Sequence, residues 1–220
     1  MAARTATSNL QPATSIDVFS DVAKPCAALG RRDRALKTAL AAIGKPHIRR
    51  RPGGFAGLFR IIVEQQVSVP SAQAIWARCN LAYPAMSPAA VLLGGESSLR
   101  AAGLSGPKAS YVIALSEAVQ SGLDLASLDA DDLAASQTLQ SLKGIGPWTA
   151  AIYLLFCEGR ADLWPPGDVA LQYAYGAALG GGKHPARELD LLAQNWAPWR
   201  GLAAHILWTY YAHLKGRVPI

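Results

Sequence analysis

Residues 139–150 read LQSLKGIGPWTA, and this stretch decides the fold. A short helix is expected to end at about Leu142. Gly144 and Gly146 permit a tight turn after it, because glycine adopts backbone conformations that other residues avoid. Pro147 then opens the next helix, since a proline in the first helical turn gives up no hydrogen bond. The stretch is therefore predicted to be two helices joined by a glycine turn.

The glycine turn has the chemistry of an anion site. The start of the second helix presents backbone N–H groups without intrahelical partners, and two glycines let a partner approach the backbone closely. The turn therefore suits a phosphate, and its carbonyl oxygens face elsewhere and could hold a monovalent cation. An ordinary corner between two helices has the same local pattern, so the turn alone leaves both interpretations open.

The sequence on both sides of this hairpin is also helical in character. Alanine and leucine dominate, and no series of alternating β-branched segments indicates a sheet. An all-α fold is therefore expected. Apolar spacing, glycines and prolines predict helices at residues 16–29, 33–43, 55–66, 71–81, 88–93, 96–101, 107–119 and 133–136, with residues 45–54 as a linker.

Length and composition narrow the class of protein. The chain has 220 residues, of which 51% are hydrophobic and 16% charged, so a sizeable core is expected and general disorder is excluded. No apolar run approaches the roughly 20 residues of a membrane span. Cys26, Cys79 and Cys157 lie too far apart for a ligand cluster or a disulfide framework. These features indicate an intracellular protein, in bacterial cytoplasm or nucleoid or in a eukaryotic nucleus.

The net charge points to a polyanionic partner. The chain carries a formal charge of +6 and a pI near 9.4, a level at which nucleic acid is worth testing. The basic residues form two groups, Arg31, Arg32 and Arg34 in one and Lys45 and residues 49–51 in the other. Two solvated helix ends would explain these groups equally well.

A second motif lies downstream of the hairpin. Residues 164–168 read WPPGD, and Asp168 lies 22 residues after Gly146. The two motifs together resemble the signature of the helix-hairpin-helix DNA glycosylase superfamily, which pairs the hairpin with a Gly/Pro-rich loop and an aspartate. Residues 59–71 and 103–111 resemble the segment that enters DNA and the segment that precedes the hairpin.

The resemblance covers roughly residues 55–215 and implies a two-lobed helical fold with a central cleft. Residues 15–54 and 160–220 would form one lobe. Residues 55–159 would form the other, with the helix-hairpin-helix at about 139–158. Residues 1–14 are predicted to be a disordered tail.

Trp148 indicates the branch, which resembles DNA-3-methyladenine glycosylase II. Members that also cleave the strand carry a lysine at this position, whose amine attacks the sugar. Tryptophan cannot do so, which implies a monofunctional glycosylase without lyase activity. Residues 196–200 and 207–208 resemble the closing helices of this branch. Three cysteines cannot supply the four ligands of an iron–sulfur cluster, so no cofactor is expected to be required.

The resemblance also assigns catalytic and pocket residues. Asp168 would be the catalytic carboxylate, because cleavage leaves an oxocarbenium-like sugar that a nearby negative charge stabilises. Capping of the helix that starts at Val169 would fix its orientation. Trp148 and Trp208 would line the base pocket and attract a cationic alkylated purine, and packing in a core is the alternative for each.

Further residues would contact DNA. Gln66 would fill the gap that a flipped nucleotide leaves in the stack, or else cap backbone groups at a helix end. A phosphate would bind the hairpin at Gly144, Gly146 and Thr149. A Na⁺ or K⁺ ion would bind the main-chain carbonyls of Gln140, Leu142 and Ile145.

The sequence thus predicts a monomeric DNA glycosylase that removes alkylated purines of the 3-methyladenine type from damaged double-stranded DNA in base excision repair. Ile152 and Val169 stand where relatives can carry tyrosines, which makes the pocket less polar and leaves the base preference open. Two alternatives remain at this stage. One is a non-catalytic DNA-binding module built on the hairpin, and the other is a glycosylase for uracil, hypoxanthine or an oxidised base.

Overall fold

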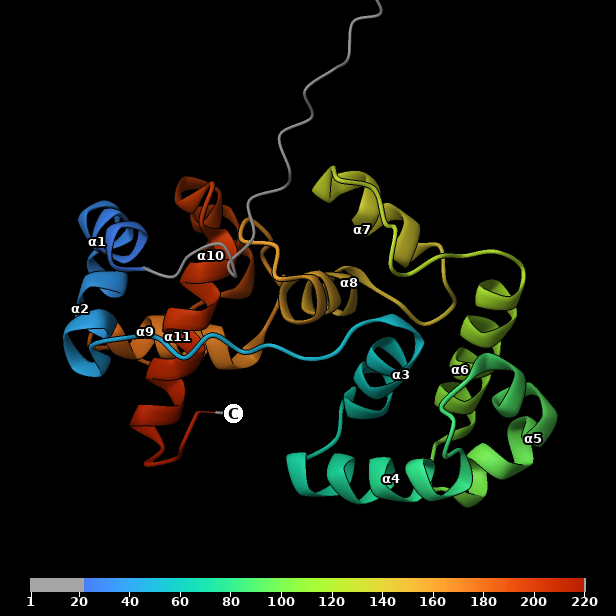
Figure 1. The fold of residues 1–220 in the computed structure, drawn as a ribbon. Helices are drawn as coiled ribbons and strands as arrows, with labels where there is room; N and C mark the ends of the chain where they lie inside the picture. Colours follow the sequence, from blue (N-terminus) through green and yellow to red (C-terminus); the bar gives the residue numbers. More distant parts are fainter. Residues whose placement is uncertain (1–21, 220) are drawn as a thin grey trace, which may run out of the picture.

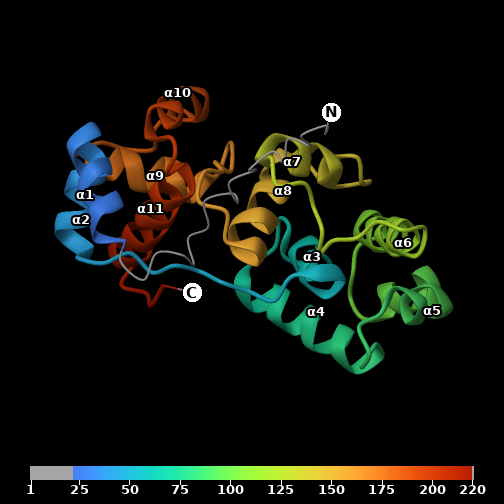
Figure 2. The same cartoon turned by 45° about the horizontal axis from the view of Figure 1, so that its top comes forward.

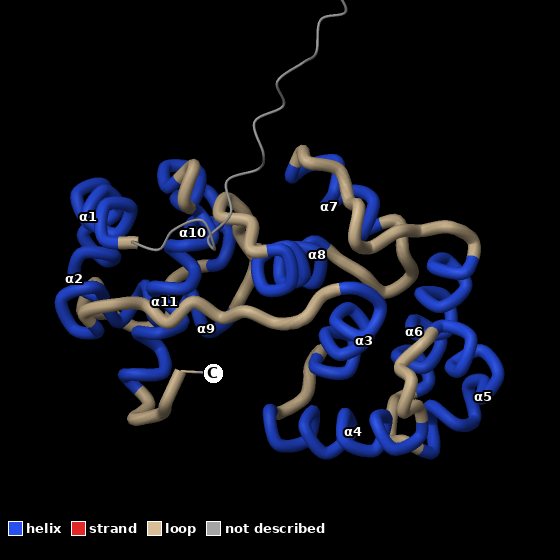
Figure 3. The backbone as a smooth tube through the Cα atoms, in the orientation of Figure 1, coloured by secondary structure: helices blue, strands red, loops and turns tan. Residues whose placement is uncertain are grey.

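The computed structural model describes residues 22–219, and every element in that range is a helix (Figure 3), so the all-α prediction is confirmed. The predicted tail at residues 1–14 lies outside the described residues. The helices are α1 (Ala23–Arg32), α2 (Arg34–Ile43), α3 (Gly54–Glu64), α4 (Val69–Ala82), α5 (Pro88–Ala101), α6 (Gly106–Gln120), α7 (Asp132–Gln140), α8 (Pro147–Tyr153), α9 (Val169–Ala178), α10 (Ala186–Leu192) and α11 (Arg200–Leu214). A π-helical segment, Leu154–Glu158, continues α8, and a 3-10 segment, Ala193–Trp196, follows α10.

The helices gather around two hydrophobic cores. Figures 1 and 2 show α1, α2, α9, α10 and α11 on one side and α3, α4, α5 and α6 on the other, with α8 between them. Buried side chains from residues 58–161 form one core, and those from residues 22–39 and 164–210 form the other. Residues 44–53 run as a loop from one side to the other (Figure 3).

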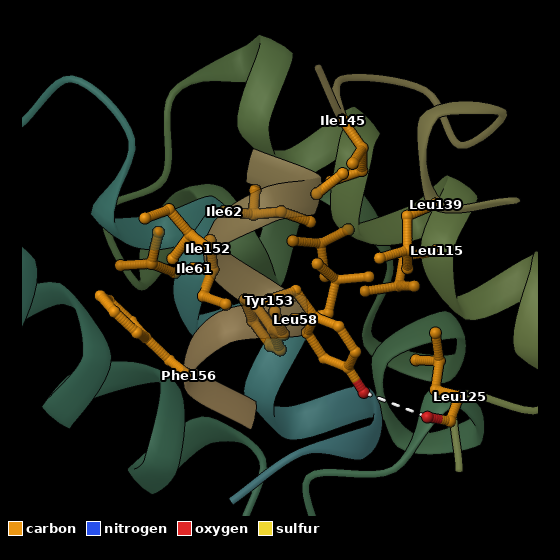
Figure 4. Close-up of a cluster of buried hydrophobic side chains, with 14 of the residues drawn as sticks. Leu58, Ile61, Ile62, Leu115, Leu125, Leu139, Ile145, Ile152, Tyr153 and Phe156 are labelled. Carbon is orange, nitrogen blue, oxygen red and sulfur yellow. Dashed lines mark hydrogen bonds between the residues drawn. The ribbon is translucent and has the colours of Figure 1, made fainter. Parts of the chain in front are cut away.

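The core around α8 is anchored by Tyr153. Its fully buried ring lies among apolar side chains that include Leu58 and Ile62 (Figure 4). Its hydroxyl donates to the carbonyl of Leu125 at 3.2 Å and accepts the N–H of Gly54 at 2.9 Å. These two hydrogen bonds compensate for the loss of water around the buried hydroxyl, and they fix α8 against the start of α3.

Several helix boundaries differ from the prediction. Gly30 lies inside α1 and does not divide the first two helices. The division falls at Asp33, whose carboxylate accepts the N–H groups of Ala35 and Leu36 at 2.7 and 3.1 Å and so caps α2. Pro70 lies in the first turn of α4, where its missing N–H costs nothing, and the helix therefore begins before it.

The two helices predicted at 88–93 and 96–101 are confirmed: they lie within α5 and are divided at Gly95, where the backbone is not helical (φ 65°, ψ −174°). The helix α7, capped by Asp131, runs to Gln140, well beyond the predicted end at residue 136. No helix within residues 22–219 is long and apolar enough to cross a membrane.

Candidate active site

The glycine turn between α7 and α8 has the predicted hairpin form. Gly144 adopts a φ of 82°, and a Cβ there would lie 2.2 Å from the ring of Tyr111. Only glycine fits this position, both in conformation and in space. Gly146 precedes α8, and a Cβ there would meet open space. The hairpin therefore leaves the backbone at Gly146 accessible to a partner.

The turn between α3 and α4 is tied to this hairpin by Gln65. Its side-chain N–H groups donate to the carbonyl of Gly144 at 3.1 Å and to the hydroxyl of Thr149 at 3.0 Å. The ammonium of Lys108 donates to the carbonyls of Val63 and Gln65, and its burial lowers its pKa. The turn between α3 and α4 and the glycine hairpin are thus held together by hydrogen bonds.

Gln66, the predicted wedge, is the next residue and lines the same hollow as Gln65. It is exposed and has a φ of 53°, in the left-handed region that few side chains adopt. Gln66 was predicted from the sequence, whereas the bridging roles of Gln65 and Lys108 were not. Two adjacent glutamines offer no signal in sequence to distinguish the one that bonds the hairpin from the exposed one.

Asp168 caps α9, as predicted, and accepts the N–H of Leu171 at 3.0 Å. The structure also brings both predicted pocket tryptophans to its carboxylate. The indole N–H of Trp148 donates to Oδ2 at 2.9 Å, and that of Trp208 lies 3.4 Å from Oδ1. Both rings are half-buried. The three residues come from three different helices, and their hydrogen bonds were not foreseen from the sequence.

Two cavities meet at Asp168. The larger, of about 760 Å³, is lined from both groups of helices, with Ile61 and Trp148 on one side and Trp208 on the other. Its volume lies in the range of small-ligand sites, about 300–1,000 Å³. Ile152 also lines it, so the wall is apolar there, as expected. Asp168 and Trp148 belong to the lining of both cavities.

The smaller cavity, of about 720 Å³, is lined by three of the four predicted DNA-binding residues, and the exposed Gly146 does not belong to its lining. Its lining includes Gln66, Gly144 and Thr149, and also Val169, which therefore does not contribute to the larger cavity as supposed. The cavity lined by predicted phosphate-binding residues thus adjoins the cavity lined by the predicted base-pocket residues.

The loop that leads into Asp168 is held by two further side chains, which were not predicted from the sequence. Asp190 accepts the indole N–H of Trp164 at 2.8 Å and the backbone N–H of Gly167 at 3.3 Å. Gln172, which is buried, donates to the carbonyls of Gly167 and Asp168 at 2.9 and 3.2 Å. Asp190 is distant in sequence from its partners, and Gln172 lies within an ordinary helix. No local sequence motif therefore predicts these contacts.

The basic residues 49–51 do not form a solvated helix end. The guanidinium of Arg50 donates to the carbonyls of Leu155 and Phe156 at 3.2 and 3.0 Å. Arg51 pairs with Glu64, and its side chain is only 9% exposed. These charges are directed into the protein, where they satisfy the end of a helix and a carboxylate.

The same segment is fastened to α11 through its backbone. His47 donates its N–H to the hydroxyl of Thr209 at 2.9 Å, and Arg49 donates its N–H to Nδ1 of His205 at 3.4 Å. Burial lowers the pKa of His205 to about 3, and the charges of His47 and Arg50 add to this effect. His205 is therefore a neutral acceptor at ordinary pH.

The hairpin carbonyls remain a predicted cation site. Gln140 ends α7, so its carbonyl has no partner within the helix and lies at the negative end of the helix dipole, which suits a cation. The carbonyl of Leu142 accepts the N–H of Ile145 at 3.1 Å, which closes the turn. Among residues 22–219, no group of three or more His, Cys, Asp or Glu side chains could hold a metal ion.

Comparison with known proteins agrees with this geometry. Residues 59–198 match the family model described as "HhH-GPD superfamily base excision DNA repair protein". A crystal structure of a DNA-3-methyladenine glycosidase from Bacillus halodurans is 30% identical and superimposes with a TM-score of 0.74, covering 94% of this chain and 95% of that one.

Two curated proteins match parts of the chain. DNA-3-methyladenine glycosylase 1 of Schizosaccharomyces pombe is 29% identical over 160 residues, which are 69% of this chain and 69% of that protein. A probable bifunctional transcriptional activator/DNA repair enzyme AlkA of Mycobacterium tuberculosis H37Rv is 35% identical over 81 residues, 37% of this chain. The match spans only 16% of the length of that relative.

Proposed function

Because the chain belongs to the HhH-GPD superfamily of base excision DNA repair proteins, we propose that it is a monofunctional DNA glycosylase that removes alkylated purines from duplex DNA. One observation carries the proposal. The carboxylate of Asp168 lies where a cavity large enough for a base adjoins the hollow that contains the glycine hairpin. The names of the relatives, two of which are 3-methyladenine glycosylases, support this base class.

In this proposal the two cores are two lobes, and DNA lies along the hairpin side of the cleft between them. A phosphate binds the N–H groups near Gly146 and the hydroxyl of Thr149, where the start of α8 favours an anion. Gln66 enters the stack and replaces the nucleotide that has turned out of it. A flipped base must leave the duplex before chemistry can reach its glycosidic bond.

The chemistry then needs a single carboxylate. As the bond from the sugar to the base breaks, its electron pair leaves with the base and the sugar becomes cationic. Asp168 stabilises that charge, and a water molecule adds to the sugar and loses a proton, which leaves an abasic strand. A cationic alkylated base is a good leaving group without further protonation, so a second carboxylic acid is unnecessary.

The decisive experiment is Asp168→Asn. Asparagine keeps the size and the capping ability but removes the charge, so single-turnover release of methylated purine should fall by about 10²–10³-fold. The cap on α9 is kept, but the NH₂ of asparagine cannot accept the indole N–H of Trp148, so the free energy of unfolding should fall by about 1–2 kcal/mol. DNA affinity should hold or rise slightly. Release at the wild-type rate removes Asp168 from the mechanism, and absence of release by the wild type itself favours a binding module.

The substrate range is tested in the same assay. Methylated duplex DNA is compared with duplexes that contain uracil or hypoxanthine, and the released bases are identified by chromatography. Preferential release of methylated purine is expected. Preferential release of uracil or hypoxanthine assigns the site to that other class of glycosylase.

The absence of lyase activity is a separate part of the proposal. Trp148 occupies the position of the possible amine nucleophile, so borohydride should trap no covalent protein–DNA adduct. Lys108 lines the smaller cavity, but its ammonium is engaged by two carbonyls. An adduct that disappears in Lys108→Met would contradict the monofunctional assignment and identify that lysine as the nucleophile.

A further inference from the structure

Three hydrogen-bond donors converge on the carboxylate of Asp168. The backbone N–H of Leu171 and the indole of Trp208 approach Oδ1, and the indole of Trp148 approaches Oδ2. The donors come from α9, α11 and α8, so the carboxylate is held from three directions. Capping alone would account for only one of these contacts.

In both indoles the N–H group contacts Asp168, while the rest of the ring lines the larger cavity. An indole has one polar group, an N–H that donates and does not accept. In Trp148 and Trp208 this group is directed at Asp168, so it is not available to the edge of a base. The rings also line the larger cavity. One tryptophan can therefore form a wall for the base and a support for the carboxylate at the same time.

We propose that Trp148 and Trp208 are positioning residues, which act on base release by holding the Asp168 carboxylate toward the sugar. The proposal rests on the function proposed above. A carboxylate on a helix cap can rotate about its side-chain bonds, and its charge is useful only when it faces the developing cation. Donors on both oxygens fix that rotation before the substrate arrives.

The hydrogen-bond lengths indicate which of the two tryptophans holds Asp168 more firmly. The contact of Trp148 at 2.9 Å has the usual length of a hydrogen bond, and that of Trp208 at 3.4 Å is long. The ring of Trp208 is also fixed by edge-on packing against the rings of Phe156 and His205, whose centroids lie 5.3 and 5.6 Å from its own. Loss of the N–H is therefore expected to matter more at Trp148.

The test removes the N–H and keeps an aromatic ring. Trp148→Phe should lower single-turnover base release by up to about 100-fold, because a misplacement of about 1 Å at a catalytic group can cost that much. DNA affinity should change little, because the ring still lines the cavity. Trp208→Phe should show a smaller loss. The matched control is Trp76→Phe, which makes the same replacement at another half-buried tryptophan that lines neither cavity.

A double-mutant cycle separates positioning from a general effect on the pocket. If Trp148 acts through Asp168, then Trp148→Phe should cause no further loss of release in the Asp168→Asn background. An equal loss in both backgrounds overturns the inference and leaves Trp148 as a wall only. A wild-type rate for Trp148→Phe also overturns it, while a low rate for Asp168→Asn alone keeps the proposed function.

A second replacement guards against misfolding of the phenylalanine variant. β-(3-Benzothienyl)alanine at position 148 keeps the bicyclic shape and the aromatic face but has sulfur in place of the N–H. Attraction of a cationic base to the ring face is preserved, so a fall in release reports the lost hydrogen bond to Asp168. Release at the wild-type rate with this side chain contradicts the inference directly.

Discussion

Two segments of the chain carry the features that predict a DNA contact, and the structure uses them in opposite ways. The hairpin at residues 139–150 leaves its glycine turn open to the smaller cavity. The basic segment at residues 45–51 turns Arg50 and Arg51 into the protein. A sequence gives the number of basic side chains but does not show whether they face solvent or the protein interior. A glycine in a turn or a capping residue, by contrast, constrains the local backbone directly.

The physical reason lies at the end of the π-helical segment Leu154–Glu158. Its last carbonyls have no partner within the helix, and a cationic side chain satisfies them well. Arg50 fills that role at Leu155 and Phe156. A Cβ at Gly159 would lie 2.7 Å from the Arg50 guanidinium carbon, so the chain leaves room for it there.

The largest expected effect tests the hairpin side of this comparison. Gly144→Ala places a methyl group against Tyr111 and requires a left-handed backbone, which together should cost about 2–4 kcal/mol of unfolding free energy. The measurement is chemical denaturation, with DNA affinity in parallel. Denaturation at the wild-type midpoint would contradict the described turn.

Gly146→Ala is the matched control for that variant. Its Cβ meets open space and its φ of −95° suits any residue, so folding should change by less than about 1 kcal/mol. DNA binding should nevertheless weaken, because the new methyl group stands where a phosphate approaches. Unchanged affinity for this folded variant would remove the phosphate from the hairpin.

The next effect tests the basic segment. Arg51→Ala leaves Glu64 without its closest partner and should cost about 1–3 kcal/mol of unfolding free energy. Glu64 keeps Arg60 at 3.2 Å and is partly exposed, so the full cost of a broken buried pair is not expected. The salt dependence of DNA binding should stay the same, because this charge does not reach a phosphate.

Lys143→Gln provides the contrast, since Lys143 stands beside the glycine turn and bonds the hydroxyl of Ser110 at 2.8 Å. Its replacement should leave stability almost unchanged and reduce the slope of log K against log salt by about one. A larger change in slope for Arg51→Ala than for Lys143→Gln would reverse the comparison between the two segments.

The smallest effect is a pH dependence of the free energy of unfolding, which arises from His205, the residue that accepts the backbone N–H of Arg49 in the basic segment. Burial holds the pKa of His205 at about 3 in the folded protein, against about 6.5 in the unfolded chain. Between these values the unfolded state binds the extra proton, so stability is full above pH 6.5 and falls as the pH drops. The loss should be about 1 kcal/mol between pH 6.5 and 5.5.

His205→Gln should remove this part of the pH dependence, because its amide does not titrate. Denaturation of both proteins at pH 7.5, 6.5 and 5.5 makes the comparison. Parallel curves for the two proteins would show that His205 does not take up the proton on unfolding.

The parts of the fold that sequence predicted are those set by local backbone chemistry. The hairpin follows from Gly144 and Pro147, and the cap at Asp168 follows from the loop before it. The helix boundary at Gly30 was wrong because packing of α1 on α2 and α11 overrides the low helix propensity of one glycine.

The parts of the site that sequence could not predict depend on contacts between distant segments. Asp190 supports the loop before Asp168 from a position on α10, and no periodicity or motif marks it. Gln65 and Gln66 are the same residue type and both follow the end of α3 at Glu64, yet Gln65 bonds the hairpin and Gln66 is exposed. Orientation at a helix end is a property of the assembled fold.

The bridge of Gln65 to the hairpin has a consequence for how the protein would read DNA. It joins the turn that carries Gln66 to the backbone at Gly144, so the two contacts have a fixed spacing. Once one is made, the other has a high effective concentration at its own site on the strand. In the proposed complex, this fixed spacing would set how many nucleotides separate the bound phosphate from the flipped base.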